Sequence, residues 1–478
     1  MRMEDQAEGA ESADRERAAE AVLKEVESRG LETIRLAFVD QHGILRGKTI
    51  VASGLASAMR SGVAITSTLL LKDTSHRTVF PVWSDNIGFG PGVLTGAGDV
   101  LMVPDPTTFR LLPWAPHSAS MLCDITFKDR SPMPFSTRGL LKRAISDLSA
   151  TGRTLICGLE VEFYVLKIEN ERLDHSDSGM PASPPETSLL SHGYQYLTES
   201  RYDILEEVMD DVRRNAQAMG LPVRSMEVEF GPSQCEFTFE PDTPLAHADN
   251  MVVFRSMTKE ICRRKGLHAT FMCRPKLDNA MPSGWHLHQS VVDAASGENL
   301  FIPGDDGALS PTASGWVAGL LEHAEASCLF TTPTVNGYKR YQPNQLAPDR
   351  VQWGRDNKGA MIRALMAPGD KASRIENRVA EPTANPYLYF ASQILSGLDG
   401  LERGLTAPPA AENPYSSDAR KLPMSLIGAI ERFEESAFYR DKLGADVARY
   451  FATIKRAEWE RYHLTVSEWE QREYFSQF

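Results

Sequence analysis

Residues 157–166 read CGLEVEFYVL, a run of β-branched, aromatic and other apolar residues interrupted by two acids, Glu160 and Glu162. Such a run predicts a β-strand. Because the side chains of a strand alternate between its two faces, both carboxylates are expected on the same face. Two acids on one face are more often the solvated surface of a strand than a site, so their meaning depends on the other clusters of the chain.

Two further clusters follow along the chain. The stretch EVEFGPSQCEFTF places Glu229 and Glu236 around a Gly-Pro turn, and PSGWHLHQS places His286 and His288 on one face of a strand. A lone H-x-H is more often satisfied polar structure than a pair of ligands. Together with the first pair, however, these residues supply four carboxylates and two imidazoles, which predicts a site for two cations. Ligation rich in oxygen suits Mg²⁺ or Mn²⁺ better than zinc.

A fourth cluster is basic and lies between residues 339 and 378. Its charged members are Lys339, Arg340, Lys358, Arg363, Arg374, Glu376 and Arg378. Cations crowded beside apolar runs in an acidic chain indicate anion recognition, because Arg forks match carboxylate and phosphate geometry. A structural network of salt bridges is an equally good interpretation of these residues alone.

The overall charge argues against two classes of binding protein. The chain has 478 residues, 51 Lys and Arg against 64 Asp and Glu, and a net charge of −13. It therefore lacks the basic footprint that binding to nucleic acid or to an anionic membrane requires. The six cysteines form no CxxC pair, which is typical of reduced thiols. Since we also find no signal peptide and no apolar window long enough for a membrane span, we expect a cytoplasmic protein.

We expect three segments in the chain. Residues 1–16 are polar and predict a mobile tail. Residues 17–130 predict a small β-rich domain, in which a helix over 18–28 precedes a strand over 33–40. The Pro-containing stretch SPMPFSTR marks its end, and residues 131–478 mix strands with long helices.

In this order and spacing, the clusters resemble the glutamine synthetase family. After E-x-E and the two acids around Gly-Pro-x-Gln come ATFM…SGxHxHxS, NxYKRxxP, W…N(R/K)xAxIR and RIExRxxxPxxNPYL. The resemblance runs from about Ile34 to the C-terminus. It implies an α+β fold with a small β-grasp-like N-terminal domain and a large catalytic domain, whose curved antiparallel β-sheet is flanked by helices. It also implies homo-oligomeric rings of six, often doubled to a dodecamer.

Carried over residue by residue, the resemblance implies a metal site and two substrate sites. Two or more Mg²⁺ or Mn²⁺ ions would be held by Glu162, Glu229 and Glu236 on one side, and by Glu160, His286 and Glu376 on the other. Arg340 and Arg378 match the arginines that hold the substrate carboxylates. The positions around the ATP phosphates are His288, Ser290, Lys358, Arg363 and Arg374. Arg340 and Arg363 are also expected to act in catalysis.

The reaction that the resemblance implies suits these residues. A carboxylate is a poor acyl donor, so ATP converts the side chain of glutamate into γ-glutamyl phosphate, and an amine then displaces phosphate to give an amide. Metal ions and arginines neutralise the charge on the transferring phosphoryl group.

The chain departs from the ammonia-using members in the flap that follows Arg340. Their PGYEAP reads PNQLAP here, at residues 343–348, so Leu346 replaces the acid that binds and deprotonates ammonium. A carboxylate lost from about 4 Å away forfeits roughly 4 kcal/mol of attraction to a cation at an effective dielectric near 20. The second acid of the ammonium site has only a loose candidate, Asp73.

These departures favour the γ-glutamyl–amine ligase branch of the family, of the γ-glutamylanilide synthase type. An apolar or aromatic amine such as aniline is the expected acceptor, since an aromatic amine is largely neutral at pH 7 and needs no acid to hold it. An ordinary glutamine synthetase is disfavoured by Leu346. A non-catalytic structural or regulatory descendant is disfavoured by the complete set of buried ligands.

Two other positions bear on the substrates. Met281-Pro282 stands where the family has Asn-Gly at the amino-acid end of glutamate. Because proline has no N–H to donate, glutamate is expected but a different acid partner stays open. Lys358 stands in place of an Arg, which keeps the charge and loses the bidentate fork.

Overall fold

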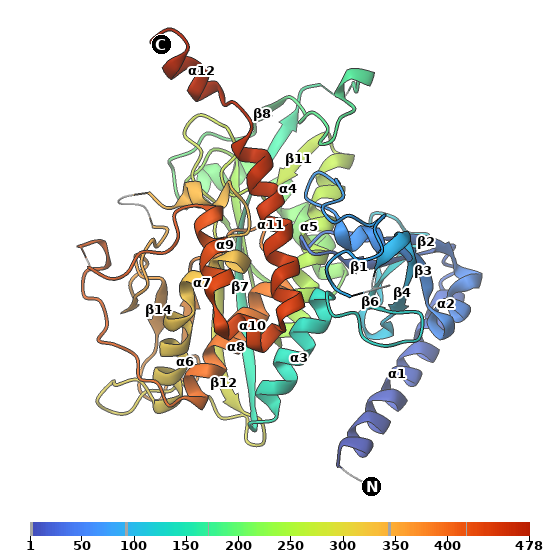
Figure 1. Cartoon of the computed structure of the whole chain (residues 1–478), viewed down its shortest axis with the longest axis horizontal. Helices are drawn as coiled ribbons and strands as arrows, with labels where there is room; N and C mark the ends of the chain where they lie inside the picture. The colour runs from blue at the N-terminus through green and yellow to red at the C-terminus, as the bar shows by residue number, and fades with distance from the viewer. Residues whose placement is uncertain (1–2, 91–93, 171, 343–345, 417) are drawn as a thin grey trace.

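The computed structural model describes residues 3–478 except 91–93, 171, 343–345 and 417 (Figure 1). A small unit of strands and short helices, drawn in blue, lies beside a larger body that contains the rest of the chain. The fold is α+β, as the sequence predicts.

The small unit is a six-stranded sheet. The order along it is β2-β1-β6-β4-β3, with β5 paired to β6. β1 and β6 run parallel and the other pairs are antiparallel. Alternate residues of β1 are buried, as in a strand with one face on the core. The strands are β1 (Thr33–Val39), β2 (Leu45–Val51), β3 (Val63–Thr66), β4 (Asp99–Pro104), β5 (Arg110–Leu111) and β6 (Ser118–Thr126).

The larger body is built on a curved sheet of nine strands. The order is β13-β14-β15-β12-β7-β10-β9, and β8 and β11 both pair with β7. All pairs are antiparallel except β13 with β14, at the edge of the sheet. The strands are β7 (Arg153–Ile168), β8 (Thr187–Leu189), β9 (Val223–Val228), β10 (Gln234–Phe239), β11 (Leu267–Thr270), β12 (Trp285–Asp293), β13 (Trp353–Arg355), β14 (Ile362–Leu365) and β15 (Arg374–Asn377).

Helices pack on this sheet and join it to the small unit. Phe254 of α5 meets Phe163 of β7 edge to face, with ring centroids 5.8 Å apart. Tyr450 of α11 stacks on Phe135 and Phe80 from the N-terminal side. The helices after the small unit are α3 (Thr137–Ser149), α4 (Glu199–Ala218), α5 (Pro244–Arg264), α6 (Pro311–Glu322), α7 (Ala324–Thr331), α8 (Pro386–Glu402), α9 (Leu426–Glu435), α10 (Ala437–Leu443), α11 (Ala445–His463) and α12 (Glu468–Tyr474). Within the described ranges, none of the helices combines the length and apolar character needed to span a bilayer.

The N-terminal segment differs from the expectation. Helix α1 spans Met3–Ser28, so the helix expected over 18–28 extends into the segment expected to be a mobile tail, 1–16. The small unit also contains a short α-helix, α2 (Leu55–Ser61). Its strands end at Thr126, whereas those of the large sheet begin at Arg153. We therefore propose residue 131 as the division between the two domains.

Arg138 at the start of α3 ties the two parts together. Its guanidinium donates to Asp249 of α5 through both Nε and Nη2, at 3.0 and 2.9 Å. It also pairs with Asp124 at 2.9 Å and with Asp105 at 2.8 Å, both of which belong to the small unit. A buried cation with three carboxylate partners fixes how these segments meet.

Candidate functional site

One face of β7 carries the two acids of CGLEVEFYVL. Leu159, Val161 and Phe163 lie in the core and are at most 1% exposed. Glu160 and Glu162 alternate with them and therefore share the opposite face, as their spacing predicts.

The neighbouring strands bring further ligands to this face. His286 of β12 lies opposite Glu160, and its Nδ1 is 3.3 Å from the carboxylate Oε2. His288 lies opposite Gly158, and its Nε2 reaches Oε1 of Glu160 at 2.9 Å. Glu376 of β15 lies opposite His288, with its Oε1 3.4 Å from Nδ1 of His286. Three adjacent strands thus converge on Glu160.

The remaining acids lie on the other side of β7, on β10 and in the turn that precedes it. Glu236 lies opposite Glu162, and Glu229 follows β9 in the turn that leads to β10. Gln234 fixes this turn, because its Oε1 accepts from the N–H of Gly231 at 2.8 Å. Its Nε2 donates to Oε2 of Glu162 at 3.0 Å, which orients that carboxylate.

These residues form overlapping groups whose ligand atoms lie within 4.8 Å of one another. The groups are Glu162 with Glu229 and Glu236, Glu160 with Glu236 and His286, and Glu160 with His288 and Glu376. The first is the trio expected for one metal ion. The trio expected for the other, Glu160, His286 and Glu376, is also brought together. His288, which we expected near the ATP phosphates, also lies beside Glu160 and Glu376.

The chemistry of this cluster fits divalent cations. Nε2 of His286 is buried with no hydrogen-bond partner in the described part of the chain, and it lies 4.0 Å from Oε1 of Glu162. Burial and the charge of Glu229 raise the pKa of Glu162 to about 8. Burial also raises the pKa values of Glu229 and Glu236, and lowers that of His286 to about 4. A cation would stabilise the crowded carboxylates, and the neutral imidazole is ready to ligate.

Glu376 links the acids to the basic cluster. Its carboxylate is fully buried, and it accepts from Nη1 of Arg363 at 3.1 Å and from Nη1 of Arg378. Arg363 also donates to Asp356 through Nε and Nη2. Arg340 lies on the short 3₁₀ helix η6 (Gly337–Arg340), and its Nη1 donates to the carbonyls of residues 378, 379 and 380 at 2.8–3.1 Å. The cluster is therefore a salt-bridge network that borders the acids, and its recognition of anions stays a prediction.

A cavity of about 1010 Å³ opens next to the acid cluster. His288, Ser290 and Arg374 line it, and Nε of Arg374 donates to Nδ1 of His288 at 3.0 Å. These are three of the five positions expected around the ATP phosphates. The other two, Lys358 and Arg363, are not among the residues that line it.

The two positions compared with the ammonium site, Leu346 and Asp73, differ in exposure. Leu346 is 46% exposed, and residues 343–345 of the same flap lie outside the described residues. Asp73 is buried and accepts from the backbone N–H groups two and four residues further on, at 2.9 and 2.8 Å. It also pairs with Arg461 of α11, so its carboxylate holds a loop of its own chain.

Sequence reasoning missed an aromatic pair beside the acid cluster. The rings of Tyr196 and Phe230 stack with centroids 4.4 Å apart and planes 9° apart. Phe230 follows Glu229 directly and donates its N–H to Oε2 of that acid at 3.1 Å. Burial and the charge of Glu229 raise the pKa of Tyr196, so its hydroxyl stays neutral. The signal in the sequence was Gly193 in HGYQYL: a Cβ there would stand 2.7 Å from the nitrogen of Pro232, so only glycine lets the two loops meet.

The segment with Met281 is anchored to β7. The phenol of Tyr164 accepts from the N–H of Met281 at 2.9 Å and donates to its carbonyl at 2.6 Å. The hydroxyl of Tyr194 lies 3.7 Å from the Met281 sulfur. The position that differs from the expected Asn-Gly is thus held rigidly, with an aromatic neighbour.

Comparisons with known proteins find similar chains over nearly the whole length. The family model described as the glutamine synthetase catalytic domain matches residues 134–474. A γ-glutamylanilide synthase from an Acinetobacter species is 41% identical, over 96% of this chain and 96% of its own. A glutamate–isopropylamine ligase from a Pseudomonas species is 32% identical, over 94% of this chain and 96% of its own. Among solved structures, a GmaS/ADP complex superposes with a TM-score of 0.79 at 25% identity, covering 95% of this chain and 99% of its own.

Proposed function

The chain belongs to the glutamine synthetase family, and we propose that it joins the side-chain carboxylate of glutamate to an apolar amine in a reaction driven by ATP. Two relatives are named for aniline and isopropylamine, both amines with an apolar body, which supports this choice of acceptor. The superposed GmaS structure is a complex with ADP, which supports the use of ATP.

The site residues divide between the steps of this reaction. Mg²⁺ or Mn²⁺ held by the six acids and histidines would neutralise charge during phosphoryl transfer. Arg340 and Arg378 hold the carboxylates of glutamate, and His288, Ser290, Lys358, Arg363 and Arg374 surround the ATP phosphates. Arg340 and Arg363 also stabilise the charge on the transferring phosphoryl group, because a guanidinium fork matches its oxygens.

The stacked pair of Tyr196 and Phe230 is the observation that carries the choice of acceptor. It places aromatic surface directly beside Glu229, at the edge of the acid cluster. A further ring stacked on such a pair gains about 0.5–1.5 kcal/mol beyond the burial of its area. Ammonia has no apolar body and gains nothing from this surface. We assign the flap position Leu346 to the same acceptor site, where it supplies no acid for ammonium.

An assay with a panel of amines tests the proposal. The purified protein with glutamate, ATP and Mg²⁺ should release phosphate faster with aniline or isopropylamine than with ammonium. The mass of the product identifies the acid partner, and we expect a γ-glutamyl amide. Faster release with ammonium would instead identify an ordinary glutamine synthetase.

We further propose that the subunits form rings of six, paired into a dodecamer. Helix α12 projects from the body (Figure 1), and the C-terminal segment carries exposed apolar side chains. Leu464 is 82% exposed, Phe475 is 74% exposed and Trp469 is 61% exposed. Apolar surface of this kind is typical of an interface with a second subunit. Light scattering should give a mass of six or twelve subunits of 53.0 kDa each.

A further inference from the structure

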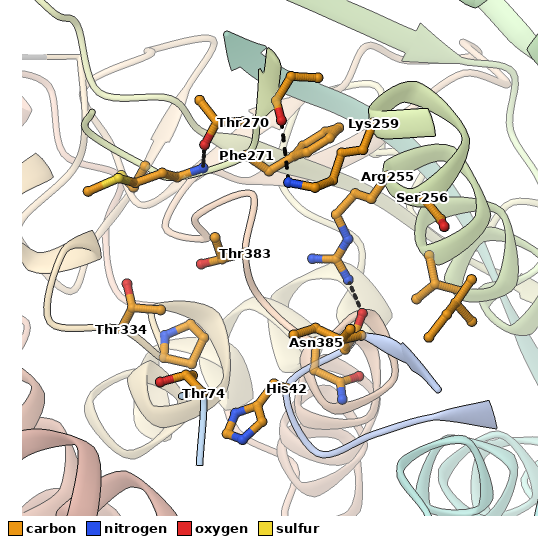
Figure 2. A pocket seen from close by; sticks show the side chains of 18 of the residues that line it. His42, Thr74, Arg255, Ser256, Lys259, Thr270, Phe271, Thr334, Thr383 and Asn385 are labelled. Atoms are coloured by element: carbon orange, nitrogen blue, oxygen red, sulfur yellow. Dashed lines mark hydrogen bonds between the residues drawn. The ribbon is translucent and has the colours of Figure 1, made fainter. Parts of the chain in front are cut away.

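A second large cavity lies between the small unit and the catalytic body. Its volume is about 950 Å³, and none of the six proposed metal ligands lines it. The turn at residues 41–45 forms one wall, while α5, β11, α8 and α11 form the others. Figure 2 shows side chains from these elements around one space, with His42 and Asn385 on one side and Lys259 on the other. The cavity is therefore separate from the proposed active site.

The charges around this cavity are predominantly positive. Arg255 bonds only carbonyl oxygens, those of Pro382 and Ala384 through Nη1 and that of Gly43 through Nη2, each at 3.0 Å. Nζ of Lys259 likewise donates to a carbonyl, at 3.3 Å. Burial lowers the pKa of Arg255 to about 10. Arg255 is half-buried and Lys259 is exposed, and neither forms an ion pair with a described residue, which leaves both able to pair with an anion.

The acidic side chain on the wall does not neutralise this charge. Glu260 is already paired with Arg35 at 2.8 Å and accepts from the indole of Trp114 at 2.9 Å. Arg263 and Arg264 also line the cavity, and neither forms an ion pair with a described residue. An excess of positive charge is thus left over, in a protein whose net charge is −13.

Two buried polar atoms on the wall have no partner among the described residues. Gln41 is 4% exposed and donates its amide N–H groups to the carbonyls of Leu69 and Lys72, which leaves Oε1 unpaired. His42 bonds the carbonyl of Lys72 through Nε2, which leaves Nδ1 unpaired. Unsatisfied buried polar atoms cost free energy, and both of these belong to the turn that forms this wall.

The rest of the wall is apolar. Phe271, Phe330, Leu388 and Phe451 line it, and all four are at most 6% exposed. A pocket with an apolar wall and a few convergent polar groups is typical of a site for a small organic molecule.

We propose that this cavity binds a small carboxylate with an apolar or aromatic body. Its carboxylate would lie between Arg255 and Lys259, and its body would lie against the wall of Phe271 and Leu388. Because the turn at 41–45 belongs to the small unit, such a ligand bridges the two domains. Thr334 also lines the cavity, three residues before the start of η6, the 3₁₀ helix that ends at Arg340, so bound ligand restrains the segment that leads to the glutamate site.

The test uses 3-phenylpropionate as the probe and the full-length protein. Isothermal titration calorimetry is done with saturating glutamate present, which occupies the carboxylate subsite of the active site. We expect saturable binding of 3-phenylpropionate and no detectable binding of its neutral amide. The Lys259→Gln variant should bind at least about tenfold more weakly, because it loses a charge-assisted hydrogen bond. Lys265→Gln, just beyond the end of the same helix but paired with Asp211 at 3.1 Å, should bind normally.

Hydrogen exchange locates the probe independently of affinity. Binding should slow exchange in peptides that cover residues 41–45 and 334–337 of the unmodified protein. Equal binding of the acid and the amide, equal binding by the Lys259→Gln and Lys265→Gln variants, or protection confined to peptides around Glu160 would each overturn the proposal. Absence of any binding to the unmodified protein would do so as well.

Discussion

His286 of β12 stands directly opposite Glu160 of β7, and its Nδ1 lies 3.3 Å from the Glu160 carboxylate. The backbone ladder between the two strands fixes this pairing over nine residue pairs. A slip of one residue would turn His286 away from the acids, because successive side chains of a strand face opposite sides. The site therefore depends on sheet register rather than on flexible loops.

Removal of one carboxylate from the Glu162, Glu229 and Glu236 group should have opposite effects with and without metal. In EDTA, Glu236→Gln should raise the melting temperature, because the pKa values of all three acids are raised by burial and crowding. In Mg²⁺, the variant should lose stabilisation by the metal, and its activity should fall by about 100-fold or more. Thermal unfolding in both buffers checks this, with Glu207→Gln on the surface of α4 as the control. A variant that Mg²⁺ still stabilises normally would remove Glu236 from the ligand set.

The residues of this site were predictable to different degrees. Side chains alternate between the two faces of a strand, and this alone predicted that Glu160 and Glu162 share a face. The same holds for His286 and His288. This alternation does not predict which strands are neighbours in the sheet. Glu376, for example, lies on β15, a strand far beyond β12 in the chain that pairs with it. Its inclusion came from the resemblance to a family.

Other features depend on tertiary contacts that local pattern does not encode. Tyr196 and Phe230 lie in two loops separated by a long helix, α4, and only the fold brings their rings together. Likewise, the sequence places Arg340 in a basic motif but does not reveal that its Nη1 donates hydrogen bonds to three carbonyls of a distant segment. Asp73, a loose candidate for an ammonium-site acid, accepts from a backbone N–H of its own loop and pairs with Arg461, and its role in the site stays a prediction.

Glu381 should make stability depend on pH near neutrality. It is fully buried, accepts from the N–H of Thr334 at 2.9 Å, and burial raises its pKa from 4.5 to about 7. A raised pKa in the folded state means that the contribution of this group to stability is highest at low pH and is lost as pH rises through about 7. Between about pH 6 and pH 8 the loss from this group is about 1 kcal/mol. Urea unfolding at the two pH values should show a smaller drop for Glu381→Gln, and an equal drop in both proteins would contradict the assignment.

Arg138 should contribute more to stability than a surface ion pair. It is 4% exposed and holds Asp105, Asp124 and Asp249 together. Arg138→Met leaves three carboxylates without their cation and should lower the free energy of unfolding by about 3–5 kcal/mol. Arg138→Lys should lose less, because it keeps the charge and loses the two-pronged bond to Asp249. Urea titration of both variants measures this, and a change below about 1 kcal/mol in Arg138→Met would show that the network is not structural.

The aromatic pair should determine selectivity between amines. Tyr196→Ala removes one ring of the stack beside Glu229, so we expect the KM for aniline to rise about tenfold while the KM for isopropylamine rises less. Tyr196→Phe keeps the ring and should behave like the unmodified protein. Steady-state phosphate release with each amine provides the measurement. If the KM values for both amines rise equally in Tyr196→Ala, the ring acts through the fold rather than through contact with the acceptor.

Leu346→Glu should move the preference toward ammonia. A carboxylate about 4 Å from ammonium adds as much as roughly 4 kcal/mol of attraction at an effective dielectric near 20, so we expect kcat/KM for ammonium to rise at least about tenfold. The same charge beside an apolar amine should lower kcat/KM for aniline, because the carboxylate must be desolvated without a cation. Leu173→Glu, which places a new acid at another exposed leucine, should change neither value. If Leu346→Glu leaves the ratio of kcat/KM for ammonium to kcat/KM for aniline unchanged, Leu346 lies outside the acceptor site. The argument for an apolar amine would then depend on Tyr196 and Phe230 alone.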